Sequence, residues 1–506
     1  MATPPGISEQ DFAAALKEFR AAVSADWVFT SDEDIALYRD AYSPFWGEPE
    51  ERLASAAVAP SSVEEVQAVM RTANKYRIPM YPISTGRNLA YGGSAPVYSG
   101  SVVLDLKRMN RVLEVNEGNA YALVEPGVSY FDLYNYITEH KYDLWIDPPD
   151  PGWGSVIGNA LDGGGGWTAY PYRDHFGAHC GMEVVLGDGE IVRTGMGAAP
   201  NSRTWQQNKW GYGPWVDGLF RQSNMGVVTK MGIWLMPRPE AYLNGTVEVF
   251  NDEDIIPLMD TLNLVENLHV VNGSTMLFAG FGDGPAWSLS IPIYGPADVV
   301  RAQMDFVKSK LAAIKGSKFS EDKIILTPPS EQDLARTPRI VALGIPNLST
   351  FSILGRSQMQ PNPAGGHIGF SPILPRNGEE IIKFRNFYRD NLNEVTGGEN
   401  LGIIGPVFMT NWERSLVGLI MFPIYKDAAQ NRKIRAAFER WAPLAAAQGW
   451  TEYRAPAIYQ DLISDTYSYN DNALRRLREK IKDAVDPNGI ISAGRYGVWP
   501  KHLRKG

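Results

Sequence analysis

The chain has 506 residues, of which 44% are hydrophobic and 21% charged, a composition typical of a globular protein of two or three domains. Its formal net charge of −9 argues against nucleic acid as a partner. The single cysteine, Cys180, excludes an intrachain disulfide framework, a multi-cysteine zinc or iron–sulfur site, and a haem held through two thiols.

The sequence also lacks the signals of a membrane or secreted protein. No apolar run approaches the roughly 18 residues of a membrane helix, and MATPPGISEQDF has neither the basic nor the apolar part of a secretory signal. We therefore expect a cytoplasmic protein without membrane contacts. The 14 Trp, 23 Tyr and 19 Phe residues suit a large core or a pocket for a flat aromatic ligand, and composition alone favours the core.

The first 240 residues predict a mixture of strands and helices without a clean βαβ alternation. Ser62 to Glu65 read as a capping box, and the apolar spacing that follows predicts a helix. Strands are expected at 77–84, 101–106 and 120–127. The segment 183–195 predicts a hairpin around Gly187-Asp188-Gly189, and 226–237 predicts a buried strand pair.

After Pro237-Arg-Pro239 the pattern changes to amphipathic helices that alternate with apolar strands. Helices are predicted at 254–266, 298–316 and 431–449, and strands at 287–294 and 416–425. We expect a second α+β domain over 241–450. The tail, 451–506, contains a helix and a Pro-Asn-Gly stop, and we expect it to return to the first domain, 1–240.

Four glycine-rich loops lie in the first domain: STGRN (84–88), EPG (125–127), GNALDGGGGW (158–167) and SNMGVVTK (223–230). None is a dinucleotide fingerprint or a Walker loop. Each alone is typical of an ordinary turn, but exposed backbone amides in such loops can hold a pyrophosphate. Together they favour a bound nucleotide, whose identity the composition does not give.

Longer motifs are similar to one family. HCGMEVVLGDGEIVRTGMGA, QSNMGVVTKMGIWLMP and EYR at 452–454 resemble the vanillyl-alcohol oxidase and para-cresol methylhydroxylase flavoproteins, particularly the eugenol-oxidase-like 4-alkylphenol oxidases. The resemblance covers nearly the whole chain. It implies an α+β, two-domain FAD-binding fold of the PCMH type, with 1–240 and 451–506 binding FAD and 241–450 forming the cap over the substrate.

The resemblance also implies which residues bind FAD. His367, in AGGHIGFSP, matches the histidine that relatives bond covalently to the flavin 8α position, although an isolated histidine is usually a surface or core residue. Arg495 matches a basic residue near flavin N1, and a surface arginine is the alternative. The other implied FAD-binding residues are Ser84, Thr85, Gly86, Arg87, Asn88, Pro126, Gly127, Gly158, Asn159, Glu183, Gly226 and Val228.

The implied activity is oxidation of para-substituted phenols. A phenol has a pKa of about 10, and loss of hydride from the para side chain is easier from the phenolate. The resemblance gives Tyr91, Tyr453 and Arg454 the role of stabilising the phenolate through charge-assisted hydrogen bonds. It gives Asp150 the role of a carboxylate beside flavin N5 that receives a proton when water adds to the quinone methide. A core tyrosine and a turn aspartate are the alternatives for Tyr91 and Asp150, and Asp147 is the nearby competitor.

The chain departs from the family beside this site. Relatives have ERGVGYTPYGDH where this chain has DGGGGWTAYPYRDH, so Trp167 replaces a pocket tyrosine and Gly164 to Gly166 remove bulk. With Gly369, Trp167 is expected to shape the pocket, and we expect a bulkier or differently substituted lignin-type phenol. The second histidine of relatives has no counterpart in RDAYSPFWGEPEERLASA.

Three functions remain open from the sequence. The first is an FAD-dependent oxidase that uses O₂ and forms hydrogen peroxide, and whose substrates are para-substituted phenols: 4-alkyl and 4-allyl phenols, 4-hydroxybenzyl alcohols, and guaiacyl- or syringyl-type compounds. The second is a dehydrogenase of the same phenols that passes electrons to a cytochrome or copper protein, and the third is a non-catalytic flavin carrier. His175 and His179 are spaced like metal ligands, but no third ligand is evident and we expect no metal. Relatives suggest a homo-oligomer.

Overall fold

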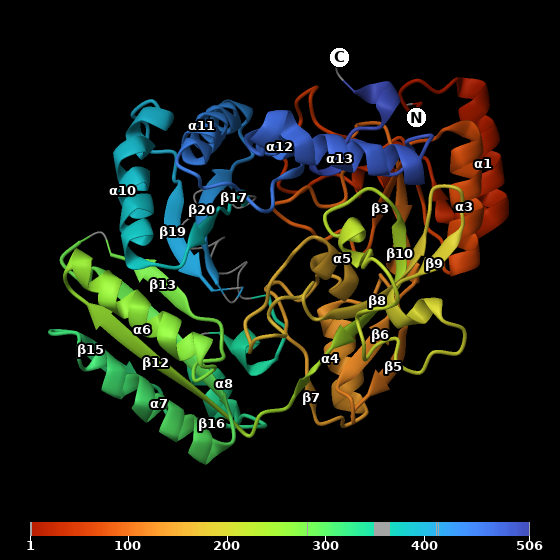
Figure 1. Cartoon of the computed structure of the whole chain (residues 1–506). Coiled ribbons are helices and arrows are strands. Elements are labelled where there is room, and N and C mark those ends of the chain that lie inside the picture. Colours follow the sequence, from red (N-terminus) through yellow and green to blue (C-terminus); the bar gives the residue numbers. More distant parts are fainter. Residues whose placement is uncertain are drawn as a thin grey trace.

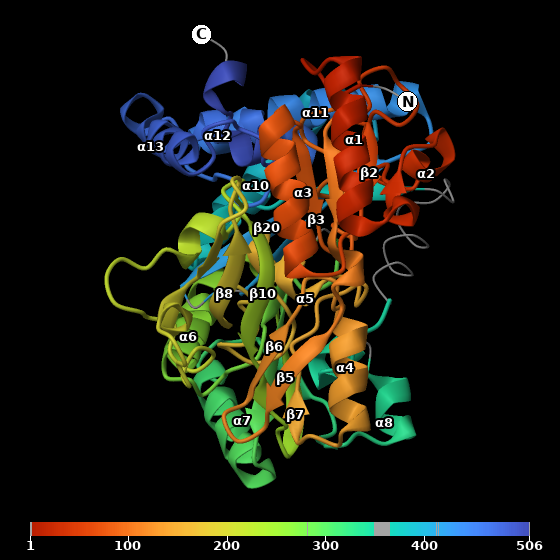
Figure 2. The ribbon, with the colours of Figure 1, turned by 90° about the vertical axis from the view of Figure 1, so that its right-hand side faces the viewer.

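The N-terminal part of the chain folds into a four-stranded sheet covered by two helices (Figure 1). In this computed structural model the described residues are 3–280, 282–337, 339–348, 365–410, 412 and 414–504. The sheet has the order β1-β2-β4-β3, with β2, β4 and β3 parallel. The bounds are β1 Val28–Phe29, β2 Ala56–Val58, β3 Met80–Ile83 and β4 Val102–Asp105. Helices α1 (Glu9–Val23) and α3 (Val63–Tyr76) lie side by side over it and share its core (Figure 2).

The predicted start of α3 is confirmed. Ser62 Oγ accepts a hydrogen bond from the Glu65 backbone N–H at 3.2 Å. The return bond of the capping box is displaced by one residue, because the Glu65 carboxylate accepts from the backbone N–H of Ser61 at 2.6 Å. Val66 and Met70 on the inner face of α3 are fully buried, as the apolar spacing predicts.

A five-stranded antiparallel sheet follows, with the order β5-β6-β10-β8-β9. The predicted hairpin is confirmed, since β8 pairs with β9 and the Leu186 N–H donates to the Glu190 carbonyl. The prediction of a strand pair at 226–237 is wrong. Val227–Trp234 form one strand of this sheet, and Met236–Pro237 form a second strand that pairs with Leu144–Trp145 in a separate two-stranded sheet and not with the first. The bounds are β5 Val112–Asn116, β6 Tyr121–Val124, β7 Leu144–Trp145, β8 His179–Val185, β9 Ile191–Arg193, β10 Val227–Trp234 and β11 Met236–Pro237.

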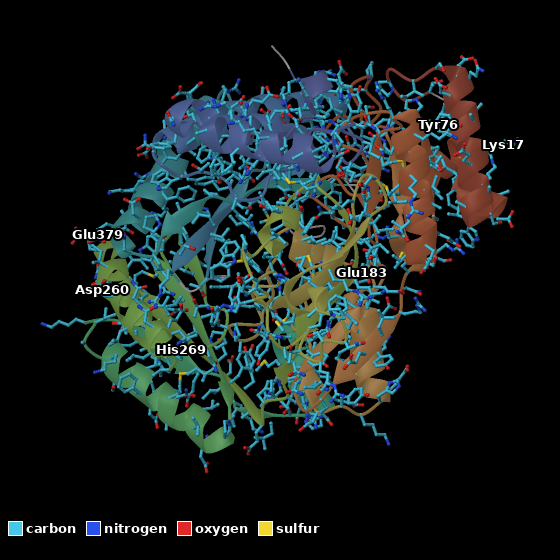
Figure 3. All side chains as sticks on the ribbon, turned by 45° about the vertical axis from the view of Figure 1, so that its right-hand side comes forward. Lys17, Tyr76, Glu183, Asp260, His269 and Glu379 are labelled. Carbon is cyan, nitrogen blue, oxygen red and sulfur yellow. The ribbon has the colours of Figure 1, made fainter. Side chains whose placement is uncertain are left out.

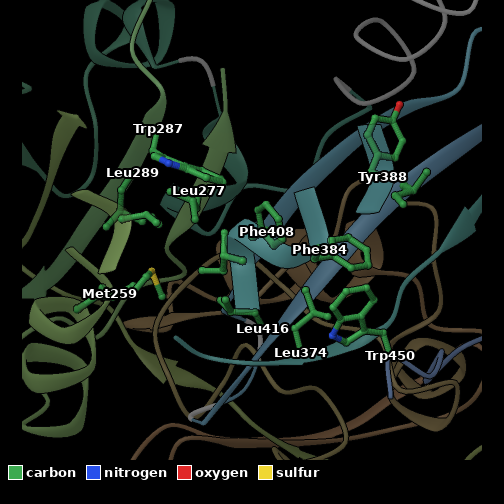
Figure 4. Close-up of a cluster of buried hydrophobic side chains, with 14 of the residues drawn as sticks. Met259, Leu277, Trp287, Leu289, Leu374, Phe384, Tyr388, Phe408, Leu416 and Trp450 are labelled. Atoms are coloured by element: carbon green, nitrogen blue, oxygen red, sulfur yellow. The ribbon is translucent and has the colours of Figure 1, made fainter. Parts of the chain in front are cut away.

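The largest sheet begins with β12 at Ala241 and has the path β15-β12-β14-β13-β19-β20-β17, with β16 on β12 and β18 on β20. Its strands are β12 Ala241–Val249, β13 Met276–Ala279, β14 Trp287–Gly295, β15 Lys318–Glu321, β16 Ile325–Leu326, β17 Gly366–Phe370, β18 Ile373–Pro375, β19 Ile404–Met409 and β20 Ser415–Ile424. The helices that pack on it are α6 Ile255–Asn267, α7 Ala297–Leu311, α10 Gly378–Val395 and α11 Ala428–Ala447. Figure 4 shows their common core, in which Trp287, Phe384 and Phe408 are fully buried.

The C-terminal tail lies against the first sheet. The Met80 N–H donates to the Ile490 carbonyl at 2.7 Å, and the Ser492 N–H donates to the Met80 carbonyl at 2.8 Å. Helix α13 (Tyr469–Val485) runs above the sheets with α11 (Figure 1). The domain bounds at 240 and 450 stay a prediction. The remaining α-helices are α2 Asp32–Ala36, α4 Tyr130–Glu139, α5 Val156–Leu161, α8 Glu331–Arg336 and α12 Gln460–Thr466.

Within the described residues, no helix combines the length and the apolar character needed to cross a bilayer.

A buried lysine fastens this tail. Lys482 is fully buried and its ammonium group contacts the Asp486 carboxylate at 2.6 Å and the carbonyls of Asn224 and Ile491. Lys482→Met would leave the buried Asp486 carboxylate without its counter-charge, with only the Ile490 and Ile491 backbone N–H groups as donors, and would remove the ammonium donor from two carbonyls. We expect the free energy of unfolding in urea to fall by about 3–5 kcal/mol. Lys480→Met, an exposed change on the same helix, should cost less than about 0.5 kcal/mol; equal losses would show that the Lys482 network is not stabilising.

Candidate functional site

A cavity of about 180 Å³ lies where the first sheet meets the five-stranded sheet. Its wall brings together eleven of the predicted FAD-binding residues. They are Ser84, Thr85, Gly86, Arg87, Asn88, Pro126, Gly158, Asn159, Gly226, Val228 and Arg495. The four glycine-rich loops, far apart in the sequence, therefore contribute to one wall.

Two glycines explain why the loops can meet. Gly86 has a φ of +67°, and a Cβ at this position would lie 2.2 Å from Ser94 Oγ. A Cβ on Gly158 would lie 2.2 Å from Ser84 Oγ. Glycine at these two positions lets the backbone of one loop lie directly against the serine side chain of another segment. Loops of this kind, with hydroxyls and Arg87 in the same wall, have the donors that a pyrophosphate needs, so the cavity fits the nucleotide part of FAD.

A second cavity, of about 380 Å³, adjoins the first, and the two share Arg87, Asn88, Gly154 and Asn159 in their walls. It brings together the predicted substrate-site residues Tyr91, Asp150, Trp167, Tyr453 and Arg454, and with them His367, which is predicted to bond to the flavin. Apolar walls come from the large sheet, at Met409, Val417 and Leu419. The volume is within the range of about 300–1,000 Å³ that small-molecule sites occupy.

Arg454 lies with Tyr91 and Tyr453 at one end of the second cavity, which we call its phenolic end. Its guanidinium carbon lies 3.9 Å from the centre of the Tyr91 ring, which favours a cation–π contact. The neighbouring Tyr453 is held by a hydrogen bond from Gln222 to its backbone carbonyl at 3.0 Å. Gly369 leaves space beside Tyr91, since a Cβ there would lie 3.3 Å from the Tyr91 hydroxyl.

One carboxylate, Asp162, holds this arginine and connects the two cavities. Asp162 is only 5% exposed. It accepts from Arg454 Nε at 2.8 Å, from Arg495 at 2.5 Å, from the Tyr496 hydroxyl at 2.6 Å and from the Asn88 amide at 2.8 Å. Asn88 also accepts from Arg454 at 2.6 Å, which closes the network.

The charges of this network favour an anion. Burial acts to raise the pKa of Asp162, but Arg454 and Arg495 outweigh it and hold that pKa below its usual value. Two guanidinium groups face one carboxylate, so the cluster keeps one excess positive charge inside the protein. Burial raises the pKa of Tyr91 although Arg454 opposes that rise, so Tyr91 stays a neutral donor. An anionic phenolate would complete the charge balance.

Asp150 and its competitor Asp147 have different surroundings. Asp147 is buried and accepts from the Trp167 and Thr168 backbone N–H groups at 3.0 and 2.6 Å. It also contacts His175 Nε2 at 2.8 Å. Asp147 therefore fixes the backbone of Trp167, whereas Asp150 lines the cavity. A Cβ on Gly166 would lie 1.6 Å from the Asp147 carboxylate, which explains one of the glycines before Trp167.

The two histidines spaced like metal ligands have separate partners. His175 contacts Asn159 and Tyr130 as well as Asp147. His179 lies 3.1 Å from Asp217.

His367 is in strand β17 with its ring 5.5 Å from the ring of Tyr42. Burial lowers the pKa of His367 to about 4, so the imidazole is neutral near pH 7. Gly366 permits the contact, because a Cβ there would lie 2.3 Å from the Tyr42 ring.

Two predicted FAD-binding residues are not brought to the cavity wall. Gly127 lies against the backbone of Lys107 and Met109. Glu183 lies in β8, where its carboxylate pairs with Arg193 and Lys230 (Figure 3).

Three features of the site were not predicted from the sequence. They are the role of Asp162, the contact between Asn159 and His175, and the position of Tyr42 beside His367. Asp162 lies inside the quoted loop GNALDGGGGW, and its acidic side chain among small residues was the available signal. Its partners Arg454 and Arg495 are 292 and 333 positions away, so no local pattern reveals the contact.

Known proteins are similar to this chain over its whole length. A family profile described as an FAD binding domain matches residues 54–195. The 4-cresol dehydrogenase [hydroxylating] flavoprotein subunit of Pseudomonas putida is 32% identical, over 98% of this chain and 97% of that protein. The 1'-carboxy-chondrochloren decarboxylase of Chondromyces crocatus is 43% identical, over 88% and 91%. The solved 4-ethylphenol oxidase from Gulosibacter chungangensis, in complex with isoeugenol, has a TM-score of 0.88 at 32% identity and covers 99% of this chain and 100% of its own.

The role of Asp162 can be tested by Asp162→Asn, which keeps the shape but removes the charge. Arg454 and Arg495 would then be buried without a counter-charge, and we expect the free energy of unfolding to fall by about 3 kcal/mol or more. Asp260→Asn, on the exposed face of α6, makes the same chemical change and should cost less than about 0.5 kcal/mol (Figure 3). Urea unfolding followed by tryptophan fluorescence measures both, and an Asp162→Asn protein as stable as the control would contradict this role.

Proposed function

The chain belongs to the vanillyl-alcohol oxidase and para-cresol methylhydroxylase family of flavoproteins, and on that premise we propose that it is an oxidase of para-substituted phenols that uses O₂. The predicted α+β two-domain FAD-binding fold of the PCMH type is confirmed, and the protein is a flavin-dependent 4-alkylphenol oxidoreductase. We also propose which molecule accepts the electrons and which residues act in the reaction. We propose that the substrates are guaiacyl- and syringyl-type phenols.

The observation that carries the proposal is the phenolic end of the second cavity. Arg454 lies against Tyr91 with Tyr453 beside it, and the buried cluster has an excess positive charge. We assign to these three side chains the role of binding the phenolate oxygen of the substrate. Two neutral hydroxyl donors and a guanidinium lower the free energy of a phenolate far more than that of a phenol in a site from which water is excluded.

Ionisation of the phenol prepares the next step. The bound flavin supplies the hydride acceptor. Loss of hydride from the benzylic carbon of the para side chain leaves a para-quinone methide, because the phenolate oxygen supplies electrons through the ring. We assign to Asp150 the role of receiving the proton when water adds to that benzylic carbon, since its carboxylate lines the same cavity.

The electron acceptor is a separate part of the proposal. Similar proteins include one named an oxidase, one named a dehydrogenase and one named a decarboxylase. A quinone methide is a chemically reasonable common intermediate for all three reactions. We favour the oxidase because a histidine stands at 367, where the resemblance links a tyrosine to cytochrome-coupled relatives. The homo-oligomer stays a prediction.

The activity is tested by adding 4-propylguaiacol to the flavin-loaded protein without oxygen and then admitting air. We expect the visible flavin absorbance to bleach on addition and to recover quickly in air, since O₂ reoxidises the flavin of an oxidase. Bleaching that persists in air would make the protein a dehydrogenase. No bleaching with any guaiacyl, syringyl or simple 4-alkyl phenol would contradict phenol oxidation.

Arg454→Met tests the phenolate site in the same preparation. We expect it to abolish the phenolate absorbance of a bound, non-reacting phenol and to slow flavin reduction by about a hundredfold or more. Arg301→Met, an exposed change on α7, should leave both unchanged. A phenolate spectrum that survives Arg454→Met would overturn the assignment.

We further propose that His367 bonds covalently to the flavin 8α carbon. A neutral imidazole is the nucleophilic form, and the lowered pKa of His367 keeps it neutral above about pH 4. Acid-precipitated protein should keep its yellow colour, and His367→Ala should give a colourless pellet. A colourless pellet from the unchanged protein would refute the covalent bond without affecting the phenol proposal.

A further inference from the structure

A buried histidine that the reaction above does not use lies behind the wall that the two cavities share. His175 is 2% exposed. Its Nε2 lies 2.8 Å from the Asp147 carboxylate, and its Nδ1 lies 2.5 Å from the amide oxygen of Asn159 and 3.0 Å from the Tyr130 hydroxyl. Asn159 is part of helix α5 and lines both cavities. A continuous hydrogen-bond path therefore runs from Asp147 through His175 to the place where the cavities adjoin.

Both ring nitrogens of His175 face hydrogen-bond acceptors. The Asp147 carboxylate accepts at Nε2, and the amide oxygen of Asn159 accepts at Nδ1. Each nitrogen then carries a proton, and the imidazolium forms a buried pair with the negative charge of Asp147. Burial raises the pKa of Tyr130 well above its usual value, so its hydroxyl stays neutral and can share the Nδ1 proton. Arg173 also acts on Asp147 through its charge, but its guanidinium donates to backbone carbonyls.

This network fixes the direction of the Asn159 amide. Its oxygen is bound to His175, so the NH₂ group is the half of the amide that remains for a ligand. The positive member of the buried pair is the one next to Asn159, and it polarises the amide toward donation. A Cβ on Gly164 would lie 2.1 Å from the amide oxygen, and a Cβ on Gly166 would lie 2.7 Å from His175 Nε2. Glycines before Trp167 therefore make room for the network.

We propose that His175 is a positioning residue for the flavin. With Asp147 behind it, His175 holds Asn159 so that the amide NH₂ group donates to an acceptor atom of the flavin ring. FAD that occupies the first cavity and presents its ring to a phenol in the second must pass Asn159, because this residue is in both walls. The ring gains electrons on reduction, so a donor held against it stabilises the reduced form more than the oxidised form. The inference concerns the cofactor and holds for any phenol or electron acceptor.

The donor is tested by Asn159→Leu in the flavin-loaded protein, a change that removes both polar atoms of the amide at similar size. We expect the ratio of reduced to oxidised flavin at a fixed potential to fall at least about tenfold, the factor that one hydrogen bond to a charged group supplies. For a two-electron couple this lowers the midpoint potential by about 30 mV. Anaerobic titration against a redox dye measures it. An unchanged or higher potential would overturn the proposal, because loss of an amide oxygen from the ring would raise the potential.

The positioning role is tested by His175→Phe, which keeps a flat ring and removes both nitrogens. This variant should lower the potential by less than Asn159→Leu does. Because His175 acts through Asn159, the reduced-to-oxidised ratio of the double variant should lie within about twofold of that of Asn159→Leu alone. Effects that add would show that His175 acts elsewhere in the fold and would overturn its role.

His179→Phe is the matched control. His179 is 1% exposed and lies 3.1 Å from the Asp217 carboxylate, and it is not among the described residues that line either cavity. The same change at this second buried pair should leave the ratio within about twofold of the unchanged protein. A shift as large as that of His175→Phe would reflect a general loosening of the fold and would overturn the proposal.

The protonation of the ring is tested in the unchanged, flavin-loaded protein. The chain has six histidines, so ¹⁵N-labelled histidine gives few ring signals in an NMR spectrum. The His175 signals are those that vanish in His175→Phe or, if that variant does not fold, those that persist in variants of the other five. We expect both nitrogens to carry protons at pH 7. One unprotonated nitrogen would overturn the proposal, because Asn159 would then donate to the ring and present its oxygen to the flavin. Neither the potential nor the protonation depends on turnover, so both results are separate from the test of phenol oxidation.

Discussion

The site depends on one carboxylate that is shared between two guanidinium groups. Asp162 holds Arg454 on the phenolic side and Arg495 on the nucleotide side. A buried charge of either sign is costly when it is alone, so an anion that joins these three charges and balances their single net excess lowers that cost. The protein therefore contains a preformed place for negative charge, and an ionised phenol or an electron-rich flavin would each be stabilised by it.

The same constraint explains the glycines and prolines around the cavities. Loops must approach each other closely to bring Asn88, Asp162 and Arg454 within hydrogen-bond distance, and side chains larger than glycine at Gly86 or Gly158 would prevent it. The large sheet contributes mostly apolar walls, such as Val417 and Leu419. Polar positioning groups on one side and apolar walls on the other give a site that orients an aromatic ring by one end.

Much of the fold and part of the site could be predicted from the sequence. Helix α3 and the β8–β9 hairpin depend on local chemistry, namely a serine cap and a glycine turn, and both were predicted correctly. The segment 226–237 was not, because the change of sheet at Met236 depends on a partner, Leu144–Trp145, that local patterning does not indicate.

The site was predicted in part. Tyr91, Tyr453 and His367 were found through family motifs and meet in one cavity. Asp162 was missed because its chemistry exists only in the folded chain. Glu183 pairs with Arg193 and Lys230 in the fold, and its predicted contact with FAD stays a prediction.

The return of the C-terminal tail has a consequence for the biosynthesis of the protein. The tail supplies Arg454, Arg495 and Tyr496, and Asp162 receives all three. A ribosome synthesises these residues after the sheets that carry the glycine-rich loops. Until residue 496 has been made, the Asp162 carboxylate lacks the two guanidinium groups and the hydroxyl that it binds in the fold. The order of synthesis therefore makes the place for negative charge one of the later parts of the structure to form.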